Sequence, residues 1–468
     1  MRAPFVVPIG IGAFFGALST RLPVGDSDVF WHLVVGRQIL QGNIGLPESV
    51  SGLSWTANGY GGSSDQWLGQ AILALADAAG GWRGIVTMRA IAVALLVGLV
   101  AYTALRERPA HPLAAVLSAL PAIVLSRFVW TERPELFGFV CFALLVLLLR
   151  AGRSGSDRAL YWIPPLIVVW ANLHGSFALG VVLTALVAIE GAIAQPARRR
   201  MYAAAGVGAF IASLLTPAGV GTWTAPAFHL FNPPRQIQEW SVPDVTTFPG
   251  MIFSVALLAT FATAFLARTR SAREAVLLLP TLFISLTALR QLPLFAIVAA
   301  PYLAAHGGEA LTELVSVLRI RSRRALSTRR PPPRIIDAVA LVIGVAVLTL
   351  AAATGTDAPD LAGFPTAALP SLRPGPGLLN QYDWGGYLIW AAPATPVFVD
   401  GRLIPYLNGV LDDYTTVLGV HPGWRDVIAR RGIRQILVRP SDPVAVRARD
   451  LGWPIRASSD TFVLIDVP

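Results

Sequence analysis

Two carboxylates and an imidazole lie close together near the start of the chain, in the segment GDSDVFWHL. Asp26 and Asp28 precede an apolar run, and His32 follows Asp28 by four residues, which places both on one face of a helix. A carboxylate in this position can take a proton from a hydroxyl group as a general base. It can also cap the helix by accepting a backbone N–H bond, so capping is the structural alternative for one of the two aspartates.

Further polar side chains recur in later turns between apolar runs, in SRFVWTERPELF, WANLHGSF, QEW and LRQ. Each one alone has a structural alternative, as a solvated loop charge or a satisfied helix-end group. Polar groups next to hydrocarbon are costly unless they face a cavity, so together they indicate a site. They are Arg127, Glu132, Arg133, Glu135, Asn172, His174, Glu239 and Arg290.

The composition indicates that a bilayer is the solvent for most of the chain. Of 468 residues 54% are hydrophobic and only 14% are charged, and the mean hydropathy is +0.60. Soluble domains carry roughly 25% charged residues. The net charge of +10 comes from arginines in short loops between apolar runs, which indicates membrane topology and not nucleic-acid binding. The single cysteine, Cys141, excludes an internal disulfide and is expected to pack in an apolar run.

Eleven apolar runs predict about eleven transmembrane helices, since crossing the hydrocarbon takes roughly 17 to 25 residues. The first run could instead be a cleaved signal peptide. The runs fall at residues 4–20, 84–105, 113–129, 135–149, 159–173, 176–194, 202–217, 250–267, 275–289, 292–306 and 335–354.

The arginines predict the orientation, because cytoplasmic loops carry an excess of them. With the N-terminus in the cytoplasm, the inner loops hold arginines at 106–108, 150–158, 198–200, 268–273 and 319–334, and the alternate loops are poorer. An odd number of spans then places the residues after about 355 outside the cytoplasm. The basic amphipathic stretch 310–330 is expected to lie on anionic lipid of the inner leaflet.

The predicted domains are a transmembrane domain of residues 1–354, a linker of residues 355–373 and an extracytoplasmic α/β domain of residues 374–468. A long first outer loop, residues 21–83, contains two amphipathic stretches that predict helices on the membrane surface. In the last domain YLIWA, PVFVD, RQILVR and TFVLID predict strands, and 405–432 and 443–450 predict helices.

The predicted outer turns bring acidic, basic and amide groups to one side of a helical bundle that can hold a lipid tail. Such an arrangement is what binding a lipid-phosphate substrate requires. A carboxylate would act as base while arginines bind the departing phosphate. A divalent metal, Mg²⁺ or Mn²⁺, could replace or assist the arginines as phosphate ligand. Its candidate ligands are Asp26, Asp28, Glu132, Glu135 and Glu239.

The architecture and GDSDVFWHLVVGRQIL resemble the GT-C superfamily of membrane glycosyltransferases, which use sugars linked to polyprenyl phosphate. That resemblance implies a base soon after the first span, Asp28 in preference to Asp26. It also implies that the acidic outer loop TERPE lies near a metal or the donor phosphate. The run QYDWGGYLIW is distantly similar to a C-terminal motif of the oligosaccharyltransferase catalytic subunit, with Asp383 and Trp384 at its centre. WANLHGSF, YDWGGYLIW and VFVDGR together are similar to a group of bacterial membrane proteins.

The resemblance implies an enzyme of the bacterial inner membrane, in glycan or glycolipid assembly of the cell envelope. It would transfer a hexose or pentose from a polyprenyl-phosphate donor to a glycan, lipid or protein acceptor outside the cytoplasm. Two alternatives remain: a transporter or flippase of a lipid-linked glycan, and a non-catalytic scaffold. The aromatic residues of YDWGGYLIW have a structural alternative, packing the domain onto the membrane surface. For Asp400, Gly401 and Arg402 the alternative is a turn with an internal ion pair.

Overall fold

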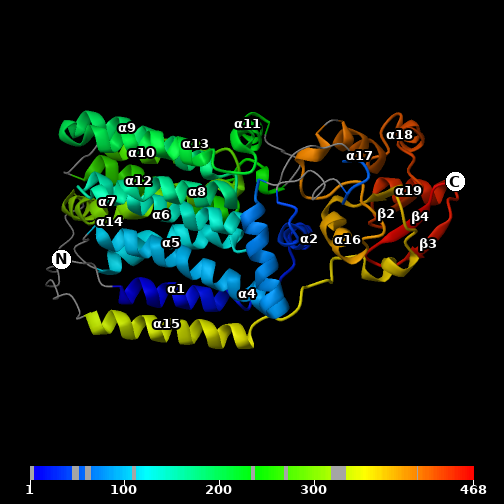
Figure 1. The fold of residues 1–468 in the computed structure, drawn as a ribbon, viewed down its shortest axis with the longest axis horizontal. Coiled ribbons are helices and arrows are strands. Elements are labelled where there is room, and N and C mark those ends of the chain that lie inside the picture. The colour runs from blue at the N-terminus through cyan, green and yellow to red at the C-terminus, as the bar shows by residue number, and fades with distance from the viewer. Residues whose placement is uncertain are drawn as a thin grey trace. The chain divides into compact units, whose positions relative to one another are not determined.

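The chain forms two units by its internal contacts, unit 1 from Met1–Leu22 and Arg83–Thr356, and unit 2 from Pro23–Trp82 and Asp357–Pro468. The computed structural model describes residues 5–44, 52–57, 65–107, 112–232, 238–267, 272–317, 334–407 and 409–468 (Figure 1). The described part of the segment that follows the first helix therefore belongs to the same unit as the C-terminal residues.

Unit 1 is helical, and each of the eleven predicted apolar runs coincides with a helix. By length and composition, five of the described helices are apolar enough to cross a membrane alone: those in Trp67–Arg106, Glu135–Arg153, Phe177–Ala194, Phe248–Leu266 and Ile335–Thr354. The number of spans stays a prediction. The helices are α1 (Val6–Ser19), the second part of α4 (Trp67–Arg106), α5 (Pro112–Ser126), α6 (Glu135–Arg153), α7 (Asp157–Tyr161), α8 (Ile163–Leu173), α9 (Phe177–Ala194), α10 (Arg199–Ser213), α11 (Thr224–Phe231), α12 (Phe248–Leu266), α13 (Ala275–Ser285), α14 (Leu292–Val317) and α15 (Arg334–Thr354).

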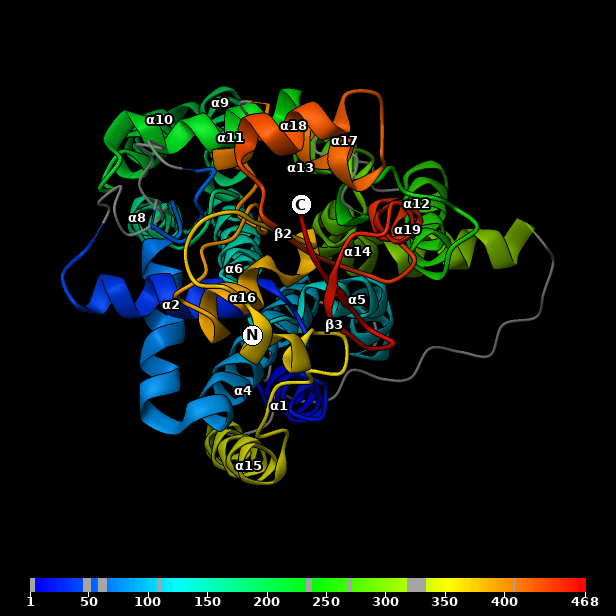
Figure 2. The same cartoon turned by 90° about the vertical axis from the view of Figure 1, so that its right-hand side faces the viewer.

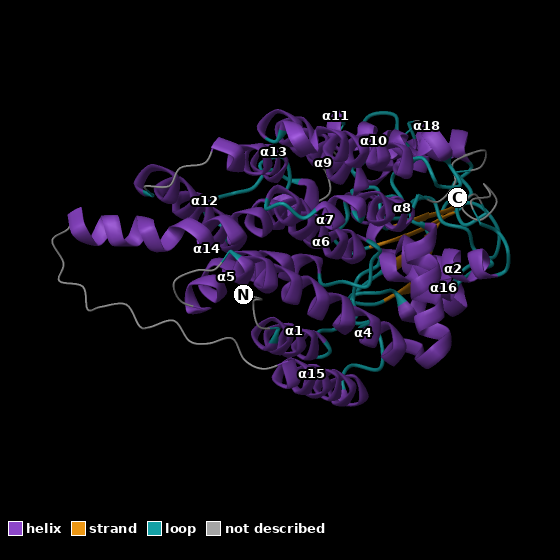
Figure 3. Ribbon diagram, turned by 60° about the vertical axis from the view of Figure 1, so that its left-hand side comes forward, coloured by secondary structure: helices purple, strands orange, loops and turns teal. Residues whose placement is uncertain are grey.

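Small residues set how closely α1 approaches its neighbours, and α1 and α15 lie side by side (Figures 1 and 3). A Cβ added at Gly12 would lie 2.5 Å from the carbonyl oxygen of Ala94, and one at Gly16 would lie 2.6 Å from that of Ala90. Two glycines four residues apart allow such backbone contact between membrane helices. The pair thus fixes α1 on α4, and the end of α1 leads to the candidate base.

Ion pairs join three of the predicted inner loops at one end of the unit 1 helices. Arg150, near the end of α6, binds Glu107 at 2.6 Å and Glu274 at 2.8 Å. Arg153 binds Glu190 at 3.1 Å. These contacts bring alternate turns to the same end, as the arginine pattern requires. The basic stretch beyond Val317, residues 318–333, lies outside the described residues.

Unit 2 contains α2 (Asp28–Leu40), the first part of α4, and a four-stranded sheet with its helices. The chain of α4 breaks at Gly80 and at Gly81, whose φ of +59° favours glycine. Strand order is β1-β2-β4-β3, with β1 and β2 parallel and the other two pairs antiparallel. The strands are β1 (Leu378–Asn380), β2 (Gln435–Val438), β3 (Ile455–Ser458) and β4 (Val463–Asp466), and the helices are α16 (Gly385–Ala391), α17 (Val410–Leu418), α18 (Trp424–Arg431) and α19 (Pro443–Asp450).

The sheet confirms two predicted strands and corrects two others. RQILVR and TFVLID contain β2 and β4, but YLIWA lies in α16, and PVFVD forms only an isolated bridge from Val397 to Ser54. The segment 405–432 contains two helices, and 443–450 is α19 as predicted. A short apolar run does not distinguish a strand from a buried helix, because both bury every side chain.

The aromatic residues of α16 pack inside unit 2. Figure 2 shows α16 beside α2, and the rings of Tyr387 and Trp390 each lie 5.4 Å from that of Phe30. Tyr387 and Trp384 are buried. The first outer loop and the C-terminal domain therefore share one aromatic core.

Candidate functional site

The turns predicted to lie outside the cytoplasm bring five of the candidate residues together in unit 1. Glu135 begins α6, His174 ends α8, and Glu239 and Arg290 lie in the short 3-10 helices Gln238–Trp240 and Leu289–Gln291. Two residues that sequence reasoning did not select, His229 and Trp240, join them. We call this set the Arg290 cluster: Arg133, Glu135, His174, His229, Glu239, Trp240 and Arg290.

Arg290 holds the cluster together through two carboxylates. Its Nε donates to Glu135 Oε1 at 2.9 Å, and its Nη1 donates to Glu239 Oε1 at 2.7 Å. Glu239 also accepts from Arg133 Nη1 at 3.3 Å. Burial would raise the pKa of Glu239, but Arg290 and Arg133 outweigh it and lower the pKa. The guanidinium of Arg290 lies 5.0 Å from the Trp240 ring centre, a distance at which cation–π attraction adds to the ion pairs.

Both histidines of the cluster are held neutral. Burial, and then the positive charge of Arg290, lowers the pKa of His229 to about 4. The pKa of His174 falls to about 3, first through burial and then through Arg290, His229 and Arg133. His174 Nδ1 accepts from the backbone N–H of Ser176 at 3.2 Å, which leaves the proton of the neutral ring on Nε2. The cluster thus offers two guanidinium groups and neutral imidazoles.

Glu132 lies apart from this cluster although it is adjacent to Arg133 in sequence. Its carboxylate pairs with Arg89, and both side chains are 1% exposed. Arg89 Nη2 also donates to the carbonyl oxygens of Ser19 at 2.7 Å and Leu22 at 2.8 Å, at the end of α1. This pair therefore anchors the chain that leads into unit 2.

Two other candidates in unit 1 have structural contacts. Asn172 donates from Nδ2 to the carbonyl oxygens of Val168 and Leu215, at 2.8 and 2.9 Å, which joins α8 to the end of α10. Arg127 lies in the 3-10 helix Arg127–Val129, with its guanidinium 6.0 Å from the Trp130 ring centre.

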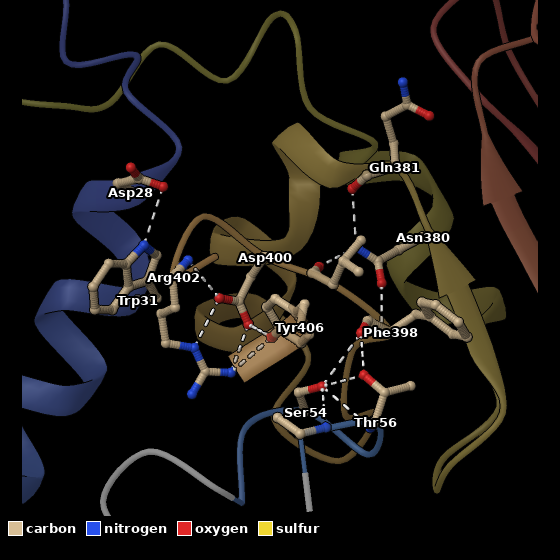
Figure 4. A network of polar contacts seen from close by, with 12 residues as sticks. Asp28, Trp31, Ser54, Thr56, Asn380, Gln381, Phe398, Asp400, Arg402 and Tyr406 are labelled. Carbon is tan, nitrogen blue, oxygen red and sulfur yellow. Dashed lines mark hydrogen bonds and ion pairs between the residues drawn. The ribbon is translucent and has the colours of Figure 1, made fainter. Parts of the chain in front are cut away.

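In unit 2 the two aspartates at the start of α2 have different partners. Asp26 Oδ1 accepts the backbone N–H of Asp28 at 2.9 Å, which is a capping contact. Asp28 Oδ1 instead accepts from the indole Nε1 of Trp31 at 3.1 Å (Figure 4). The Asp28 carboxylate also lies against Gly401. The two aspartates thus differ in their contacts, and the choice of Asp28 as the base stays a prediction.

The segment DGR forms a buried ion pair beside Asp28 (Figure 4). Asp400, which is fully buried, accepts from Arg402 Nε at 2.8 Å and Nη2 at 2.6 Å. Tyr406 donates its hydroxyl proton to the same carboxylate. Burial, and then the charge of Asp400, raises the pKa of Tyr406 well above its ordinary range.

The remaining candidates in unit 2, His32, Asp383 and Trp384, each have different contacts. His32 is buried, and its ring centre lies 3.6 Å from that of Trp31. Its Nδ1 lies 3.2 Å from Nε2 of Gln70. Asp383 is exposed and pairs with Arg439 at 2.9 Å. Trp384 is buried and donates its indole N–H to the carbonyl oxygen of Gly363 at 2.9 Å.

The described carboxylates are not arranged as a metal site. Over the described ranges, no three His, Cys, Asp or Glu side chains come close enough together to hold a metal ion. Glu132, Glu135 and Glu239 are each paired with arginine, which neutralises the charge that a divalent cation would require. We therefore derive no step through a metal.

Two solved membrane glycosyltransferases have a similar fold. The oligosaccharyltransferase of Archaeoglobus fulgidus, solved with a tethered acceptor peptide, has a TM-score of 0.55 at 12% identity, over 92% of this chain and 68% of that one. ArnT from Cupriavidus metallidurans, solved with undecaprenyl phosphate, has a TM-score of 0.51 at 14% identity, over 98% of this chain and 97% of that one. This chain shares the fold of these two glycosyltransferases.

The shared fold confirms the fold that the resemblance noted from the sequence implied. At these identities the likeness concerns the fold alone. No family model and no curated protein sequence matches the chain.

Proposed function

We propose that this chain transfers a sugar from a polyprenyl-phosphate donor to an acceptor outside the cytoplasm. The observation that carries the proposal is the likeness to ArnT over nearly the whole of both chains, because that protein was solved with undecaprenyl phosphate bound. The Arg290 cluster supports it with two guanidinium groups, which bind phosphate oxygens well.

In the proposed reaction Asp28 is the base. An acceptor hydroxyl attacks the anomeric carbon of the sugar, and its proton passes to the Asp28 carboxylate as the new C–O bond forms. The bond between the sugar and the phosphate oxygen breaks, and polyprenyl phosphate leaves with the electron pair. Within unit 1, Arg290 and Arg133 are the proposed ligands of a phosphate group. Glu135 and Glu239 orient Arg290 for this role.

The proposed setting is the inner membrane of a bacterium, with the N-terminus in the cytoplasm and unit 2 outside it. About eleven spans would give this arrangement, and the arginine-rich loops would lie inside. The acceptor is a glycan, lipid or protein of the cell envelope.

The test uses the full-length chain in proteoliposomes with undecaprenyl-phosphate hexoses and pentoses and an extract of envelope glycolipids. We expect release of undecaprenyl phosphate coupled to labelling of the acceptor. Asp28→Asn should lower the transfer rate at least about 100-fold, the usual loss when a general base is removed. Asp460→Asn, an exposed aspartate between β3 and β4, is the control for loss of an acidic residue.

The result also separates this function from transport. A flippase would move the labelled donor across the bilayer without consuming it. The donor would then stay intact with the wild-type chain as well as with Asp28→Asn. Full transfer by both Asp28→Asn and Asp26→Asn would show that the base is another residue.

A further inference from the structure

Two adjacent glycines at the start of α16 let two other backbones touch it. A Cβ added at Gly385 would lie 2.2 Å from the carbonyl oxygen of Val399 and 2.7 Å from the Cα of Asp400. A Cβ added at Gly386 would lie 2.2 Å from the carbonyl oxygen of Ser27. No side chain fits at either position. The start of α16 therefore holds both the segment that leads to DGR and the residue before the first turn of α2.

A third glycine lies where these two segments meet. A Cβ added at Gly401 would lie 1.8 Å from Oδ1 of Asp28 and 2.7 Å from its Cγ. The Asp28 carboxylate thus lies directly against the Gly401 backbone. Any side chain at position 401 would displace the carboxylate.

The DGR turn is firmly held on both sides of Gly401. On the C-terminal side, Asp400 binds the backbone N–H of Arg402 at 3.0 Å as well as its guanidinium. On the N-terminal side, Asn380 Oδ1 accepts the N–H of Phe398 at 2.8 Å, and Asn380 Nδ2 donates to the carbonyl oxygen of Val399 at 2.8 Å. Because these groups are buried, moving the turn would leave several of them without hydrogen-bond partners, which is unfavourable.

We propose that Gly401, Gly386 and Trp31 are positioning residues that fix the Asp28 carboxylate for its role as base, and that the DGR turn is its support. The inference rests on the proposed function, since it takes Asp28 as the base. Trp31 sets the direction of the carboxylate through its indole N–H, and Gly401 limits how far it moves. The buried Asp400–Arg402 pair keeps the support rigid.

The first test measures transfer by Gly401→Ala in the full-length chain, with undecaprenyl-phosphate sugars as donors. Displacing a catalytic group by about 1 Å lowers rates about 100-fold, so we expect a loss of that order in kcat. Binding of undecaprenyl phosphate alone should keep its wild-type affinity, because the substitution removes no phosphate ligand. Gly363→Ala is the matched control, since an added Cβ there meets nothing within 4 Å.

A second variant covers the case in which Gly401→Ala does not fold. Trp31→Phe keeps a ring in the same place and removes the N–H that binds Asp28. We expect kcat to fall about 10-fold, the loss of one hydrogen bond to a charged group, with unchanged affinity for undecaprenyl phosphate.

A double-variant cycle tests the contact between Gly401 and Asp28 by thermal unfolding, which needs no activity assay. If Gly401→Ala acts by steric collision with Asp28, its effect on the melting temperature should shrink by at least half in an Asp28→Ala background. An equal shift in both backgrounds, or wild-type kcat in Gly401→Ala or Trp31→Phe, would overturn the positioning role while the transferase function stands. Absence of transfer by the wild-type chain would instead refute the proposed function and, with it, this role.

Discussion

The buried pair of Arg89 and Glu132 offers a quantitative prediction about how unit 1 holds the end of α1. Both side chains are 1% exposed, so neither charge has water to stabilise it. Glu132→Gln keeps the shape and removes one charge, which leaves the guanidinium buried beside a neutral amide. Removing one partner of a buried ion pair costs about 3–5 kcal/mol.

The second partner should matter more, because Arg89 also serves two carbonyl groups of α1. Arg89→Met leaves the Glu132 carboxylate buried and also removes the donor to Ser19 and Leu22. Each of those hydrogen bonds to a charged donor contributes about 1.5–3 kcal/mol. The double variant Arg89→Met/Glu132→Leu buries no charge and loses only these bonds. It should therefore be more stable than Arg89→Met.

The assay is thermal unfolding of the full-length chain in nanodiscs. At about 2 °C per kcal/mol for a large domain, Glu132→Gln should lower the melting temperature by roughly 6–10 °C. Arg37→Met is the control, since it breaks a pair in which Arg37 is 48% exposed, and exposed pairs contribute about 1 kcal/mol or less. A shift in Glu132→Gln no larger than this control, or a double variant less stable than Arg89→Met, would refute the reasoning.

Three other predictions concern the two candidate sites. Arg290→Lys loses the two-pronged contact to Glu135 and Glu239, so the affinity for undecaprenyl phosphate should fall at least about 10-fold by calorimetry; unchanged affinity would place the phosphate elsewhere. The lowered pKa of His229 means that the folded state resists protonation, so its contribution to stability is present above pH 6.5 and is lost as the pH falls toward 4. His229→Gln should flatten the melting temperature over that window, and an identical slope would contradict the assignment. Tyr406→Phe removes a buried hydroxyl from the Asp400–Arg402 pair and should destabilise the chain by about 1–3 kcal/mol in denaturant unfolding; a neutral effect would mean that the pair needs no third partner.

The helices of unit 1 could be predicted because hydrocarbon requires a continuous apolar run, and such a run is visible in sequence. The same alternation of turns predicted that Glu135, Glu239 and Arg290 would meet, since every second turn lies at the same end of the bundle. Sequence spacing did not reveal Trp240 or His229, because an aromatic or imidazole side chain in a Pro-rich turn has no distinctive pattern.

The roles of neighbouring acidic residues could not be read from the sequence. Glu132 and Glu135 are three residues apart, but one pairs with Arg89 beneath the end of α1 and the other with Arg290. Asp26 and Asp28 likewise differ only in what lies opposite them. Partners that are distant in sequence decided both cases.

The sequence by itself determined the positions of the apolar helices and the chemical types available at their ends, and it predicted a bilayer around most of the chain. Those properties follow from local composition and periodicity. Only the tertiary structure decided that YLIWA is a helix, that the first loop packs with the C-terminal residues, and that Gly401 lies against Asp28. The physical reason is that the close contacts of Gly386 with Ser27 and of Gly401 with the Asp28 carboxylate depend on long-range packing, which local sequence preferences do not determine.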